Sequence, residues 1–102
     1  MNGIIRIDRV VSQLEVWLDQ SFPFAKMRVK IIDRGSKEFI AVSNLNCKNR
    51  NTNDVDYISG LGSTADDALN DLLIRFVSLS QKNAPASGLT EDDFEWSAPE
   101  DF

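Results

Sequence analysis

The sequence contains no histidine and a single cysteine, Cys47. Zinc sites are built mostly from cysteine and histidine, and nucleophilic triads usually take their base from histidine. The chain therefore lacks the ligands for a structural zinc site, and no Asp or Glu pair has a spacing that singles it out for acid/base chemistry. One thiol cannot form an internal disulfide, which fits a reducing compartment. We expect a cytoplasmic protein that is not an enzyme and holds no metal or cofactor.

Long apolar runs are also lacking. No stretch approaches the roughly 20 apolar residues that a membrane-spanning helix needs. Arg6, Asp8 and Arg9 interrupt the N-terminal segment, which therefore does not resemble a signal peptide. A chain of 102 residues, 42% of them hydrophobic, is typical of one globular domain with a modest core.

The charges are distributed unevenly along the chain. All 11 basic residues lie at or before Lys82, and with ten acidic residues they give residues 1–88 a net charge of +1. Residues 89–102 contain six acidic residues and no basic one, which brings the whole chain to −5. Such a contrast between a domain and its terminus is typical of an interaction tail.

The first half of the chain shows a helical spacing followed by alternation. Apolar residues recur at 7, 10, 11, 14, 17 and 18, which predicts an amphipathic helix over 7–18. Residues 24–32 alternate as a strand does, with Met27, Val29 and Ile31 on one face and basic residues on the other. Residues 33–36 predict a hairpin turn, and residues 38–45 predict the second strand.

Residues 57–81 predict a strand end, a Gly-x-Gly turn and a helix. Ser63 or Thr64 can cap this helix, with Asp66 or Asp67 completing a capping box. With a third strand over 55–59, the predicted order is α-β-β-β-α. This is an α+β domain over residues 1–83, with a three-stranded antiparallel sheet and both helices on one face. Residues 84–102 are predicted to be a disordered acidic tail.

The predicted order resembles that of the double-stranded-RNA-binding domain over roughly residues 5–81. In that family the last turn and helix read Gly-x-Gly-x-Ser-Lys-Lys-x-Ala-Lys. Gly60, Gly62, Thr64 and Ala68 match this motif, whereas the three lysines are replaced by Ala65, Asp66 and Leu69. The resemblance therefore implies the fold, and the two aspartates at the helix start argue against binding double-stranded RNA in the manner of the family.

The last residues resemble the acidic tip of single-stranded-DNA-binding proteins, which ends in acidic residues followed by phenylalanine. The resemblance implies that an aromatic ring and a carboxylate enter a basic-rimmed pocket on a partner protein. It also implies that, without a partner, the tail can lie on its own basic surface and compete with nucleic acid. The expected partner-binding residues of the tail are Phe94, Trp96, Glu100, Asp101 and Phe102.

The basic face of the first predicted strand is the candidate nucleic-acid interface. Basic side chains among exposed aromatic residues neutralise phosphates while bases stack, at about 1–3 kcal/mol per stacked base. The alternative is a solvated edge strand that its charges protect from aggregation. Phe39 belongs to the interface only in one strand register, because a one-residue slip turns it into the core. The expected interface consists of Lys26, Arg28, Lys30, Arg34, Lys37, Phe39, Lys48, Arg50 and Tyr57.

These features predict a non-enzymatic protein that binds single-stranded nucleic acid and recruits a protein through its tail. DNA is favoured over RNA as the nucleic acid. An accessory replication or recombination protein of a phage or mobile element fits this plan. Because residues 1–88 carry only +1, we expect a homo-oligomer that aligns several basic strands. The alternative is a small acidic inhibitor, such as an immunity protein, antitoxin or anti-defence protein, whose acidic groups bind a basic protein surface.

Overall fold

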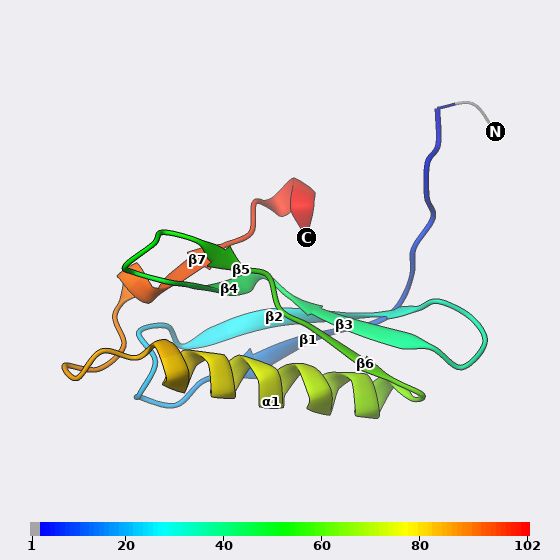
Figure 1. The fold of residues 1–102 in the computed structure, drawn as a ribbon. Coiled ribbons are helices and arrows are strands. Elements are labelled where there is room, and N and C mark those ends of the chain that lie inside the picture. The colour runs from blue at the N-terminus through cyan, green and yellow to red at the C-terminus, as the bar shows by residue number, and fades with distance from the viewer. Residues whose placement is uncertain (1–2) are drawn as a thin grey trace.

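The computed structural model describes residues 3–102 and contains one long helix and two antiparallel sheets (Figure 1). The larger sheet has the order β1-β2-β3-β6, and the smaller has the order β5-β4-β7. The helix α1 (Ala65–Asn83) covers one face of the larger sheet, and its C-terminal half also contacts β4 and β7 of the smaller sheet (Figure 1). The strands are β1 (Arg9–Trp17), β2 (Lys26–Asp33), β3 (Phe39–Ser43), β4 (Leu45–Lys48), β5 (Val55–Asp56), β6 (Ser59–Gly62) and β7 (Phe94–Trp96). Two short 3₁₀ helices, η1 (Glu91–Asp93) and η2 (Pro99–Asp101), flank β7.

The chain is α+β, but the predicted three-stranded sheet with two helices is wrong because residues 9–17 form a strand. This strand, β1, pairs antiparallel with β2, and Leu14 and Val16 face the core. The register shifts between Val10 and Ser12, which marks a bulge. The bulge interrupts the alternation of apolar residues and produces a spacing that looks helical. The three β-branched valines of this segment favour a strand.

The helix α1 begins where its sequence predicts. The Thr64 hydroxyl caps it by accepting a hydrogen bond of 3.0 Å from the Asp67 backbone N–H. Ala68, Leu72 and Phe76 lie on its buried stripe, at the four-residue spacing of one helix face. The helix also bonds to the sheet, because Asp71 Oδ2 accepts a hydrogen bond of 2.9 Å from the Leu61 backbone N–H. This bond lowers the pKa of Asp71 from its usual value.

The helix lies unusually close to β6. A Cβ atom on Gly60 would lie within 3.0 Å of backbone atoms of Ala68 and Leu72, and one on Gly62 would meet Asp67 and Ala68 in the same way. Glycine is therefore required at both positions for steric reasons, not for an unusual backbone angle. The predicted Gly-x-Gly turn is in fact the contact surface between β6 and α1.

The prediction of a disordered C-terminal tail is wrong. Residues 94–96 form β7, which pairs antiparallel with β4 through Leu45–Trp96 and Cys47–Phe94. Phe94 is 5% exposed and belongs to the core. The aromatic residues that distinguish this tail from an ordinary acidic tail are what order it, because disordered segments are poor in such residues.

The described residues 3–102 contain no helix that is long and apolar enough to cross a membrane. The single long helix has Asp66 and Asp67 in its first turn and Lys82 in its last.

The close contact between β6 and α1 predicts a strong effect of Gly60→Ala. The added methyl group meets helix backbone that cannot move without shifting α1, so we expect a loss of about 1–3 kcal/mol in the free energy of unfolding. Urea denaturation measures this loss. The neighbouring change Ser59→Ala is the control, because Ser59 is exposed and its side chain points away from the helix. Equal stabilities of the two variants would contradict the close packing.

Candidate nucleic-acid interface

The two faces of β2 are those predicted from its alternation. Met27, Val29 and Ile31 are buried under α1, whereas Lys26 and Arg28 are exposed on the opposite face of the sheet. Lys30 lies on that same face and is half-buried. We call the face of the larger sheet that is opposite α1 the outer face. The basic strand of the candidate interface therefore exists.

The register of β3 differs from the predicted one, and Phe39 leaves the interface. Ser43 lies opposite Val29, and Ala41 lies opposite Ile31, so both point towards α1. Phe39 points the same way and packs against the core. Ile40 and Val42 lie on the outer face instead. The inner residues that are fully buried under α1, Ala41 and Ser43, are small, whereas Phe39 at the start of β3 packs against the core and stays partly exposed.

An aromatic residue from the segment that was predicted to be a helix lies on the outer face. Trp17 is 69% exposed and lies opposite Lys26 in the β1–β2 pairing. The Lys26 ammonium lies 4.9 Å from the centre of the indole ring and 3.0 Å from a carboxylate oxygen of Glu15. Trp17 could have been recognised as an outer-face residue from its parity with Gln13 and Glu15, had this segment been interpreted as a strand.

The remaining predicted cations are scattered. Arg34 and Lys37 lie in the exposed hairpin turn between β2 and β3, where Lys37 and Gly35 have positive φ angles of 59° and 82°. Lys48 is half-buried in β4, in the smaller sheet. Tyr57 is 77% exposed and lies between β5 and β6.

A groove of about 290 Å³ runs over the outer face. Its floor contains Lys30, Ile40 and Val42, and Tyr57 lines one side. Arg34 lines it at the hairpin end, and the N-terminal segment adds Arg6, whose guanidinium pairs with Asp8 at 3.1 Å. We call this concavity the outer groove. Arg6 was not among the predicted interface residues, because nothing in the sequence shows that its segment lies beside the outer face.

The C-terminal residue occupies part of the outer groove. The Lys30 ammonium donates a hydrogen bond to the backbone oxygen of Phe102 and lies 4.9 Å from the centre of its ring. Phe102 and Asp101 both line the groove. The segment after β7 therefore returns to the basic face, and the acidic tip and the basic strand lie in contact.

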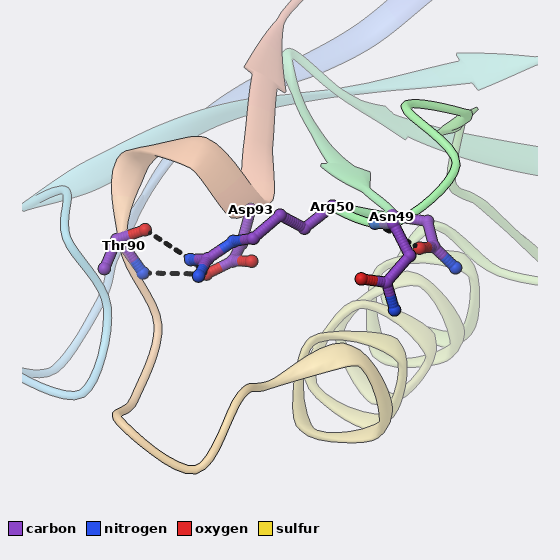
Figure 2. A network of polar contacts seen from close by, with 5 residues as sticks. Asn49, Arg50, Thr90 and Asp93 are labelled. Carbon is purple, nitrogen blue, oxygen red and sulfur yellow. Dashed lines mark hydrogen bonds and ion pairs between the residues drawn. The ribbon is translucent and has the colours of Figure 1, made fainter.

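Arg50 is not free to bind a ligand, because it holds the C-terminal segment in place (Figure 2). Its guanidinium bonds to Asp93 Oδ2 at 2.9 Å and to Thr90 Oγ1 at 2.7 Å. Asp93 is 2% exposed, and the same Oδ2 accepts a 2.9 Å hydrogen bond from the Thr90 backbone N–H. Within residues 3–102, Asp93 Oδ1 has no hydrogen-bond partner, so the carboxylate depends on these contacts.

Phe94 packs inside the protein, and Trp96 packs with one edge against Phe24 at the surface. The Phe94 ring lies 6.0 Å from the rings of Phe22 and Phe24 and 6.1 Å from that of Phe76. Trp96 contacts Phe24 edge-on at 4.9 Å and remains 43% exposed. Of the predicted partner-binding residues, Trp96, Glu100 and Asp101 are exposed, Phe102 is half-buried, and Phe94 is core.

The thiol of Cys47 lies between β4 and α1, away from the outer groove. Cys47 is buried beside the Ser80 hydroxyl, and burial raises the pKa of its thiol. Residues 3–102 contain no group of three or more Cys, Asp or Glu side chains placed to hold a metal ion.

Comparison with protein-family models, curated proteins and solved structures gives no significant match. The resemblances to the double-stranded-RNA-binding domain and to acidic tips therefore remain hypotheses that rest on sequence motifs.

The bonds between Arg50 and Asp93 predict that Arg50→Met destabilises the protein. The change leaves a buried carboxylate without its cation. Breaking a fully buried pair costs about 3–5 kcal/mol, and we expect about 2–3 kcal/mol here because Arg50 is partly exposed. Urea denaturation followed by tryptophan fluorescence measures the change.

The matched control is Arg75→Met, which removes the same charge from the exposed pair with Asp71 on α1. Such surface pairs contribute about 0–1 kcal/mol. If both variants lose the same stability, Asp93 does not depend on Arg50.

Proposed function

We propose that this protein binds single-stranded nucleic acid in the outer groove and does not catalyse a reaction. DNA is the nucleic acid that we favour. One observation carries the proposal: cations from the N-terminal segment and from β2 with its following turn, together with an exposed aromatic ring, line one groove with an apolar floor. Arg6, Lys30 and Arg34 supply the positive charge, and Tyr57 supplies the ring. A cytoplasmic accessory role in replication or recombination is the biological context that we infer for such a protein.

Single-stranded nucleic acid matches the chemistry of the groove. Phosphates are neutralised by the cations, and unpaired bases stack on Tyr57 and contact the aliphatic floor formed by Ile40 and Val42. Trp17 and Lys26 extend the same face along β1 and β2. No feature of this arrangement reads the edges of particular bases, so we expect little sequence preference and strong salt dependence.

The C-terminal tip acts as a built-in competitor in this proposal. Phe102 presents a backbone oxygen and a ring to Lys30, as a nucleotide presents an acceptor oxygen and an aromatic base. Nucleic acid and the tip therefore compete for the Lys30 ammonium. When nucleic acid displaces the tip, residues 97–102 become available to recruit a protein partner, whereas Phe94 stays in the core.

The test is fluorescence anisotropy with a labelled oligothymidylate at low and moderate salt. Truncation after Ala98 removes η2 and Phe102 but keeps β7, so the fold stays intact and the affinity rises. The charge control is the full-length double variant Glu100→Gln/Asp101→Asn, which loses the same two acidic side chains but keeps Phe102 on Lys30. We expect a larger gain from the truncation than from this variant.

Lys30→Ala in the truncated protein is the loss-of-function variant. Removing one phosphate contact reduces the slope of log affinity against log salt by about 0.7 for a single strand. Lys82→Ala, which removes one charge at the far end of α1, leaves this slope unchanged. If neither the full-length nor the truncated protein binds the oligonucleotide, the proposal is wrong. Capture of a protein that requires the acidic tip but not Lys30 would then support the inhibitor class.

A further inference from the structure

The longest free edge of the larger sheet is formed by β1. Its nine residues pair with β2 on one side, and no strand among residues 3–102 pairs with its other side. The opposite edge strand, β6, has only four residues and lies against α1. Unpaired backbone groups along a sheet edge form a template for another strand. β1 contains no proline or lysine, the residues that commonly block such pairing.

Exposed apolar side chains are concentrated along this edge and the segment before it. Large exposed apolar patches on monomeric proteins mark interaction surfaces. The bulge lies at the N-terminal end of β1, so residues 12–17 remain a regular strand. The exposed large apolar residues between positions 4 and 17 are Ile4, Ile5, Ile7, Val10, Val11 and Trp17.

The sequence of β1 is complementary to itself in one antiparallel register. We propose that two copies pair through β1, with Leu14 of one copy opposite Leu14 of the other. In this register Gln13 of each copy lies opposite Glu15 of the other copy on the outer face. The Gln13 amide can there donate a hydrogen bond to the Glu15 carboxylate. It also places Val11 beside Trp17 and brings Arg9 towards Asp19 at each end, so opposite charges meet.

The pairing has a defined geometrical consequence. A twofold axis perpendicular to the sheet joins two four-stranded sheets into one of eight strands. Both α1 helices then lie on one side, and both outer grooves lie on the other. A single strand of nucleic acid could run across both grooves, and this last consequence rests on the proposed function. The dimer itself does not, and it is tested without nucleic acid.

The first test uses two substitutions of opposite charge at Gln13, with sedimentation velocity over a concentration series. Gln13→Glu sets carboxylates against Glu15 of the other copy, and we expect a dissociation constant about three- to tenfold higher. Gln13→Lys creates two ion pairs and lowers the constant by a similar factor. Within one chain Gln13 lies opposite Lys30, so Gln13→Glu favours the folded monomer and Gln13→Lys disfavours it. These effects on the monomer are opposite in sign to those expected for the dimer.

The second test is disulfide cross-linking, which reads the register directly. Residues directly opposite one another in antiparallel strands have Cα atoms about 4.5–5.5 Å apart, within the reach of a disulfide. Leu14→Cys should therefore form an oxidised dimer by itself. Ser12→Cys and Val16→Cys should cross-link only when the two proteins are mixed. Cys47 is buried and does not compete.

A wild-type protein that sediments as a monomer at every concentration overturns the proposal. So does a dimer in which Ser12→Cys cross-links to itself while Leu14→Cys does not, because that result requires a different register. The proposal is also contradicted if Gln13→Glu lowers the dissociation constant of the dimer and Gln13→Lys raises it.

Discussion

The buried carboxylate of Asp93 joins the C-terminal segment to the rest of the protein. Arg50 reaches it from the loop after β4, and Thr90 closes the turn on the other side (Figure 2). This contact positions Phe94 in the aromatic core and β7 beside β4. Because β7 is fixed, the few residues that follow it can reach back to Lys30. The acidic tail is thus a structural element whose last residue lies on the basic face.

The two faces of the larger sheet have different requirements. The inner face accepts α1 at close range, which selects glycine at Gly60 and small side chains at Ala41 and Ser43. The outer face is not covered by α1, and it carries basic residues on β2 and the apolar Ile40 and Val42 on β3. Segments from both ends of the chain border this face, and the groove between them carries opposite charges from Arg6, Lys30 and Asp101. Acidic residues of the chain therefore lie beside its own basic face.

The sequence predicted the elements in which local signals and packing agree. The Thr64 cap and the buried stripe define α1, and the strict alternation defines β2. It failed where a local pattern was ambiguous. The bulge near Val11 gave β1 a helical spacing, and Phe39 was assigned to the interface although the observed register of β3 turns it towards the core.

The candidate site was predictable only in part. The basic residues of β2 and the exposure of Tyr57 follow from alternation and from the turn around it. The contributions of Arg6 and Phe102 depend on where the two ends of the chain lie, and no local pattern encodes that. The role of Arg50 was obscured for the same reason, since its partner Asp93 is 43 residues away in sequence.

The central claim is that the outer groove holds either nucleic acid or the C-terminal tip. Titration of the isotopically labelled full-length protein with an oligothymidylate, followed by backbone amide NMR, tests it most directly. The account predicts shifts at Lys30, Ile40, Val42 and Tyr57, together with movement of the Phe102 amide towards its position in an unstructured peptide. Shifts confined to α1, or shifts at the groove while the Phe102 signal stays unchanged, would contradict it.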